Sequence, residues 1–184
     1  MTVSLKYVAR PSRTVLRLDL IAGVSSFIYS EFEMMDEWRL PEWLSLFADE
    51  CLYWVPIDPS RSPDECISII CDDHLRLEER LYYLLEAGGA STKPRSRTLH
   101  MLGGVQVWEG GSPGELVVST RQVIHELRLG DYAQVGLGQT RELPAAIDYR
   151  LVTAPHTAFG YQIVAKRVEL LHRDQPLWNM MFVL

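Results

Sequence analysis

The chain has 184 residues, of which 47% are hydrophobic and 23% charged, enough to form one domain with a buried core. Its formal net charge is −6, and no basic run with interleaved aromatic residues occurs, which argues against broad binding to nucleic-acid phosphates. No stretch approaches the roughly 20 apolar residues that span a bilayer, so no membrane partner is expected.

The N-terminal segment, MTVSLKYVARPSRTVLRLDL, lacks the uninterrupted apolar core of a secretory signal. Cys51, Cys66 and Cys71 lack CxxC spacing. In a chain without an export signal, such cysteines are expected to be reduced and mostly packed. The expected location is therefore the cytoplasm.

A single domain is expected over residues 1–184. Its first part, residues 1–13, reads as a loose arm with Pro11 near its end. Residues 14–88 form a helix-rich half, and residues 95–184 form an antiparallel sheet. Helices first and a meander of strands second is the order typical of an α+β domain.

The first half contains three predicted helices and two predicted strands. Apolar residues follow helical spacing over residues 14–38, and Pro41 suits the first position of a short second helix. The runs CLYWVPI (51–57) and CISII (66–70) are typical of short strands. Leucines at helical spacing over residues 73–87 predict an amphipathic helix that ends before two glycines.

The second half reads as five consecutive strands joined by glycine-containing turns, EGGSPGE and RLGDY among them. Strands of ten or more residues twist, so the sheet is expected to curve strongly around the N-terminal helices as a cone. Such a cone can enclose a small-molecule cavity or be filled by its own side chains. The five runs are RTLHMLGGVQVW, ELVVSTRQVIHELRL, DYAQVGLGQTRELPAAIDYRLV, FGYQIVAKRVELL and LWNMMFVL.

Cys71, Asp72, Asp73 and His74 are consecutive, a thiol, two carboxylates and an imidazole that suggest a metal or catalytic site. Consecutive residues do not converge on one point in a strand or a helix. Asp72 or Asp73 at the start of the third helix is better explained as a helix cap, and Asp72 is spaced for an ion pair with Arg76. Cys71 is expected to be a packed thiol, and the carboxylates have a subunit interface as their alternative role.

An internal motif around and after this cluster consists of Ser68-Ile69-Ile70, Asp72-Asp73, Arg76-Leu77-Glu78, Arg80, Pro94, Ser96-Arg97-Thr98 and His100. This motif resembles the small (β) subunits of aromatic-ring-hydroxylating dioxygenases, the multicomponent Rieske non-haem iron oxygenases. The front segment EFEMMDEWRLPEWLSLFADECLYWVP and the tail YQIVAKRVELLHRDQPLWNMMFVL are similar as well, so that the resemblance covers nearly all of the chain after residue 20.

The chain departs from the family pattern at four places, one of which is the strand around TRQVIHELRL. Cys71 stands where the family often has tyrosine, Leu99 where a basic residue is common, and Gly103-Gly104 where a polar pair is common. These departures bear on which large subunit the chain would pair with.

The resemblance implies a cone-shaped α+β fold like that of nuclear transport factor 2 and ketosteroid isomerase. It implies assembly with a larger α subunit, as an α3β3 complex in which the β subunits form a trimer. The α subunit would carry the Rieske [2Fe–2S] cluster and the mononuclear iron, leaving no cofactor on this chain. The implied function is that of a non-catalytic structural β subunit in the dihydroxylation of an aromatic compound.

The residues of the chain agree with this division of labour. A Rieske centre needs a double set of paired cysteine and histidine ligands, which three cysteines at these positions do not supply. The five histidines show no HxxxH or HxxxD spacing for a 2-His-1-carboxylate iron site. No catalytic, cofactor-binding or metal-binding residue is therefore expected on this chain.

Five residues are expected at subunit interfaces: Arg97, His100, Asp72, Asp73 and Arg167. Arginines recur through the strands while acidic residues concentrate in the helical half. These arginines either lie on a solvated sheet face or pair with carboxylates across subunit interfaces. Arg97 is the preferred candidate because it lies in the family-like Ser-Arg-Thr segment.

A stand-alone isomerase or dehydratase with the same cone fold is the alternative hypothesis. It would need a cavity with an Asp or His general base and a Tyr donor. Candidates for these groups are Tyr53, Tyr132, Tyr161, His100 and His125. A ligand-binding or self-associating protein of this fold is a third possibility, which would also need a partly empty cone.

Overall fold

A computed structural model of the chain describes residues 15–65, 67–87, 93–130, 135–177 and 180–184. The expected loose arm over residues 1–13 lies outside the described residues. The elements are a short 3-10 helix at Leu18–Leu20, α1 (Ile21–Asp36), α2 (Leu40–Leu44), β1 (Phe47–Pro56), β2 (Ser68–Asp72), α3 (His74–Tyr82), a π-helical turn at Tyr83–Ala87, β3 (Arg97–Glu109), β4 (Glu115–Leu127), β5 (Thr140–Thr153) and β6 (Tyr161–Leu170).

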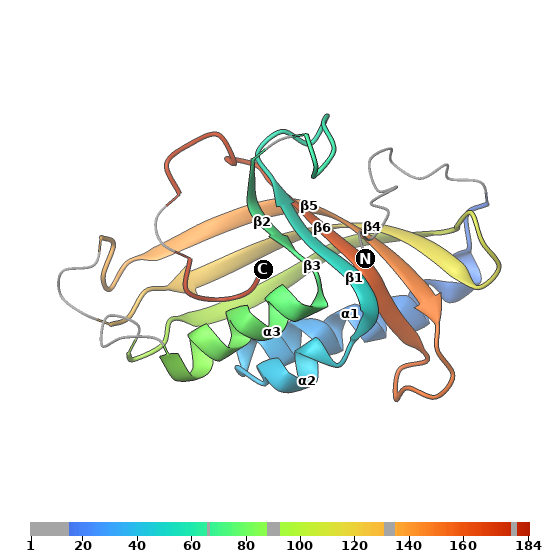
Figure 1. Cartoon of the computed structure of the whole chain (residues 1–184), viewed down its shortest axis with the longest axis horizontal. Coiled ribbons are helices and arrows are strands. Elements are labelled where there is room, and N and C mark those ends of the chain that lie inside the picture. Colours follow the sequence, from blue (N-terminus) through green and yellow to red (C-terminus); the bar gives the residue numbers. More distant parts are fainter. Residues whose placement is uncertain (1–14, 66, 88–92, 131–134, 178–179) are drawn as a thin grey trace.

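The six strands form one strongly curved sheet in the order β2-β1-β6-β5-β4-β3, with the helices on one side of it (Figure 1). The meander from β3 to β6 is antiparallel, as predicted. β1 from the first half pairs with β6 in parallel, so the whole sheet is mixed although its second-half strands are antiparallel as expected. Long-range pairing of this kind joins segments far apart in the sequence, and local patterns do not reveal its direction.

The first helix is shorter than its sequence pattern predicts. It ends at Asp36, and Trp38 then adopts the left-handed conformation with a φ of 59°. The Trp38 indole donates a hydrogen bond to the carbonyl of Ser96 at 3.2 Å, and the Arg95 guanidinium lies 4.8 Å from the ring centroid. These contacts offset the cost of placing a bulky residue in a conformation that favours glycine.

Two predicted strands differ from the structure. The third strand of the second half begins at Thr140, because Gly136 and Gly138 before it form a turn with positive φ angles of 77° and 71°. The final run, LWNMMFVL, is not a strand in its described residues. Its last three residues, 182–184, instead bury their side chains in the core.

The core fills the space between the helices and the inner face of the sheet. α1 packs on β3, and α3 packs on β1. The end of the chain lies between α3 and the sheet in Figure 1. Buried aromatic rings occupy much of this interior, among them Phe27, Trp43, Phe47, Tyr53 and Tyr149.

Candidate functional site

The four consecutive residues 71–74 lie at the start of α3, where they cap the helix. Asp73 is the N-cap residue, and its carboxylate accepts a hydrogen bond from the backbone amide of Arg76 at 2.9 Å. The expected Asp72–Arg76 ion pair is wrong, because Arg76 donates to the carbonyl of Cys71 instead. Asp72 pairs with Arg80 at 2.5 Å, two helical turns into α3.

Within the described residues, Cys51, Cys71 and His74 do not form a shared site. Burial raises the pKa of Cys51 to about 12, and burial also raises the pKa of Cys71, as expected for packed, unreactive thiols. Cys66 lies outside the described residues. His74, at Cys-x-x-His spacing from Cys71, turns towards Glu78 with 3.6 Å between the imidazole and the carboxylate.

His100 is buried and is hydrogen-bonded to Asp36 at the end of α1. The two Asp36 oxygens bind the His100 imidazole Nδ1 at 2.6 Å and its backbone amide at 2.9 Å. The Phe32 ring lies 5.1 Å from the imidazole, centroid to centroid. Burial favours a higher pKa for Asp36, but its hydrogen bonds with His100 and the charge on that imidazole hold the pKa below the ordinary 3.8.

Asp36→Asn is expected to reduce the loss of unfolding free energy that the protein shows as the pH falls below 4. A carboxylate whose pKa is depressed by folding stabilises the fold above its unfolded pKa, here the ordinary 3.8, and this contribution is lost as the pH falls below that value. Urea unfolding between pH 2.5 and 6 measures the effect. A variant with the same steep loss of unfolding free energy below pH 4 as the wild type would contradict this assignment.

The two arginines of the expected interface set differ in their surroundings. Arg97 is exposed at the start of β3 and makes no ion pair within the described residues. Arg167 is buried on the outer side of β6, where it pairs with Glu169 at 2.7 Å and lies 5.5 Å from the Trp54 ring centroid. Asp72, Asp73 and His100 also have partners within the chain. These contacts do not test a role at a subunit interface, which stays a prediction for all five residues.

A buried ion pair, which the sequence analysis missed, lies at the centre of the cone. Glu31 on α1 and Lys166 on β6 are both fully buried and pair at 2.7 Å. Glu31 also accepts hydrogen bonds from the Tyr149 hydroxyl at 2.7 Å and the Trp43 indole at 3.1 Å. Burial lowers the pKa of Lys166 and raises the pKa of Tyr149. The signals in the sequence were a glutamate on the apolar face of α1 and a lysine at an inward position of a strand.

The end of the chain closes the interior beside this ion pair. The Tyr53 hydroxyl donates to the Leu184 carbonyl at 3.0 Å and accepts from the Leu184 amide at 2.9 Å. Burial raises the pKa of Tyr53. A tyrosine fixed in this way by the backbone is not free to serve as a donor to a bound substrate.

The groups proposed for an isomerase or dehydratase do not gather around one cavity in the described residues. Tyr53 and His100 are bonded within the chain, as described above, and Tyr132 lies outside the described residues. His125 lies on the outer face, 3.6 Å from Glu142. Tyr161 lines a pocket of about 520 Å³ beside the β3–β4 turn, whose carboxylates are already ion-paired to arginines: Glu109 to Arg17, and Glu115 to Arg150.

No iron-binding cluster is present in the part of the chain that the structure describes, since no three or more Cys, His, Asp or Glu side chains are grouped to hold a metal ion. The described residues therefore do not supply the ligands of either iron centre. None of the described helices has the length and hydropathy needed to cross a membrane.

The fold is that of the nuclear transport factor 2-like class. An NTF2-like protein with a cystatin-like fold from Novosphingobium aromaticivorans superposes with a TM-score of 0.54 at 13% identity, covering 84% of each chain. The β subunit of benzoate 1,2-dioxygenase from Burkholderia mallei superposes with a TM-score of 0.66 at 20% identity, covering 92% of this chain and 99% of that subunit.

Sequence comparison assigns the family within this fold. A family model described as the ring hydroxylating beta subunit matches residues 30–174. The small oxygenase component of the p-cumate 2,3-dioxygenase system of Pseudomonas putida is 31% identical over 131 residues, which cover 70% of this chain and 72% of that protein. The chain belongs to the ring hydroxylating beta subunit family, which confirms the resemblance found in the sequence.

Proposed function

We propose that the chain is the non-catalytic β subunit of an aromatic-ring-hydroxylating dioxygenase, and that it supports assembly with an iron-containing α subunit. The observation that carries this proposal is the family match over residues 30–174. A cone filled by its own side chains and closed by Leu184 supports a structural role over chemistry in its interior.

The partner in this proposal is an α subunit that holds the Rieske [2Fe–2S] cluster and the mononuclear iron. The β subunits form a trimer within an α3β3 complex, which takes part in the breakdown of an aromatic compound in the cytoplasm. The p-cumate dioxygenase relative supports an aromatic substrate for the complex. The net charge of −6 supports a protein partner over nucleic acid.

The physical contribution of this chain is rigidity. The Glu31–Lys166 pair joins α1 to β6, the Asp36 contacts join α1 to β3, and the Asp72–Arg80 pair joins β2 to α3. Elements fixed to each other in this way present their outer surfaces in a constant arrangement. Such a subunit can hold several α subunits at set distances, so that electrons pass between their iron centres.

Arg97→Ala is expected to weaken assembly without unfolding the chain. The Arg97 side chain is exposed and makes no ion pair within the described residues, so its removal costs the isolated chain little. A guanidinium that pairs with a carboxylate across an interface contributes more. Native mass spectrometry of the complex measures the loss, and an unchanged complex with native circular dichroism would remove the hypothesis.

Affinity purification of the tagged chain from its own host tests the proposed function. We expect a larger chain to co-purify with iron and with the visible spectrum of a Rieske cluster. A tagged chain that is recovered alone, without iron or colour, from cells grown on aromatic carbon sources would contradict the proposal.

A further inference from the structure

The outer face of the sheet, which points away from the helices, carries an exposed apolar band. Met101, Val123 and Pro144 are register neighbours on β3, β4 and β5, and the amide of Leu171 donates to the Pro144 carbonyl at 2.9 Å. Met101 is 54% exposed and Leu171 72% exposed. We call these four residues the outer band; they cross the sheet at right angles to its strands.

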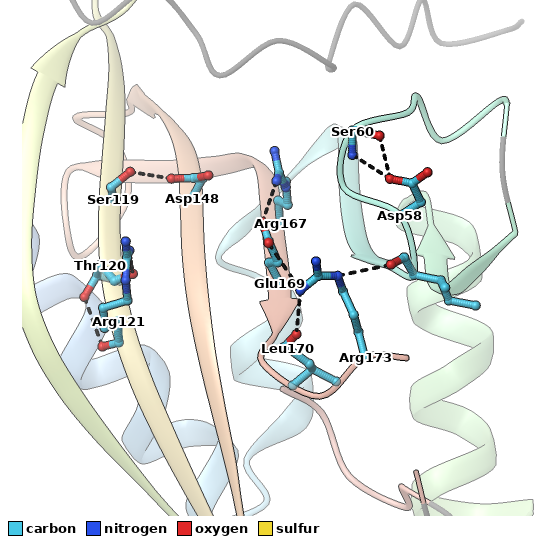
Figure 2. A network of polar contacts seen from close by, with 11 residues as sticks. Asp58, Ser60, Ser119, Thr120, Arg121, Asp148, Arg167, Glu169, Leu170 and Arg173 are labelled. Atoms are coloured by element: carbon cyan, nitrogen blue, oxygen red, sulfur yellow. Dashed lines mark hydrogen bonds and ion pairs between the residues drawn. The ribbon is translucent and has the colours of Figure 1, made fainter. Parts of the chain in front are cut away.

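Arginines flank a hollow of about 270 Å³ at this band, which Val123, Pro144 and Leu171 help to line. Arg121 on β4 and Arg173 after β6 both line this hollow, and Figure 2 shows their two side chains. Arg173 is held by the carbonyls of Ile57 and Leu170 and by Glu169. Arg121 is exposed, and within the described residues its guanidinium bonds only the carbonyl of Thr120, at 2.9 Å. A cationic group next to apolar surface is therefore available to a partner.

A surface of opposite charge lies on the far side of the molecule, along α3. Leu75, Glu79 and Tyr82 recur at i, i+4 and i+7, so they share one stripe of α3. Glu86 follows in the π-helical turn at Tyr83–Ala87 that continues the helix. Leu75 is 64% exposed and Tyr82 is 65% exposed. The opposite side of α3 packs into the core. We call these four residues the α3 stripe: it is apolar and acidic where the outer band is apolar and flanked by arginines.

We propose that the outer band of one protomer binds the α3 stripe of a second copy of this chain, with Arg121 facing Glu79. α3 lies on the helix side of the sheet (Figure 1), whereas Val123 and Pro144 alternate with buried residues of β4 and β5 and so point to the other side. The two surfaces therefore do not meet within one chain. Contact between two different surfaces of identical chains is heterologous, and such contacts close into a ring when the rotation allows. The inference rests on the proposed function, because it names the surfaces through which the β subunits associate.

A charge-reversal cycle tests the pairing: Arg121→Glu, Glu79→Arg, and both together, each in the purified complex and in the chain alone. Each single variant places like charges opposite each other and is expected to weaken self-association at least about tenfold, as measured by light scattering over a dilution series. The double variant restores the pair with its sign inverted and is expected to return to within about threefold of the wild type. Glu50→Arg, a reversal at an exposed residue of β1 outside both surfaces, is the matched control.

Three outcomes would overturn the inference. The first is that the single variants fold and self-associate as strongly as the wild type. The second is that the double variant self-associates no more strongly than the single variants. The third is that the wild-type chain does not self-associate, either in the purified complex or alone. If the single variants release the larger partner chain while self-association is unchanged, the outer band binds that partner instead. The proposed function fails separately, when the wild-type chain co-purifies with no iron-containing partner.

Discussion

Glu31→Gln is expected to lower the free energy of unfolding by about 3–5 kcal/mol, the usual cost of leaving one member of a buried ion pair without its partner. Lys166 is fully buried and has Glu31 as its ion-pair partner in the described residues. Glutamine keeps the size of the side chain and can still accept from Tyr149 and Trp43, so that the loss reports mainly on the charge. Guanidinium chloride unfolding followed by circular dichroism measures it.

The pH dependence of the same variant provides a second readout. The pKa of Lys166 lies below its ordinary 10.5 because burial outweighs the stabilising charge of Glu31. Without Glu31 the pKa falls further, so the unfolded chain binds more protons than the folded one over a wider range below 10.5. The variant should therefore regain stability as the pH rises towards 10.5, more steeply than the wild type.

Glu31→Gln combined with Lys166→Met is the control, because it removes both charges and leaves methionine in place of the lysine. We expect the double variant to be more stable than Glu31→Gln alone. A single variant within about 1 kcal/mol of the wild type, with no change in its pH profile, would show that the Glu31–Lys166 pair does not hold α1 to β6.

Leu184→Ala is the second variant with a large expected effect, a loss of about 2–5 kcal/mol of unfolding free energy. Leu184 is fully buried, and the truncation leaves a cavity beside Tyr53 while the two backbone hydrogen bonds to its hydroxyl can persist. Thermal unfolding with chemical denaturation at a fixed temperature measures the loss.

Tyr53→Phe separates packing from hydrogen bonding at the same place. It removes the hydroxyl that bonds the Leu184 backbone but keeps the ring, so we expect a smaller loss, about 1–3 kcal/mol, because the Leu184 groups stay buried without a partner. A Leu184→Ala variant as stable as the wild type would mean that the end of the chain does not close the cone.

The sequence predicts the fold class and most of its elements because these depend on local patterns. Leucine spacing predicts α3, an aspartate before it predicts the cap at Asp73, and long alternating runs predict β3 and β4. The parallel pairing of β1 with β6 was not predictable in this way, because the register is set by packing between distant segments. The tail from residue 177 has the composition of a strand, but the side chains of residues 182–184 are buried in the core instead.

The candidate site was predictable only in part, for a related reason. The motif around Asp72 and Arg97 identified the family, yet Asp72 pairs with Arg80 and not with the nearer Arg76. His100 was recognised as a distinctive residue, but its partner Asp36 is 64 residues away. Ion pairs between distant elements, such as Glu31 with Lys166, need the folded arrangement to be seen.

Iron content measured on this chain and on its partner after they are separated under native conditions tests the central claim most directly. The account predicts that iron and the Rieske absorption remain with the larger chain, while this chain stays folded and colourless with far less than one iron per molecule. One iron per molecule of this chain, retained through separation, would contradict a purely structural role.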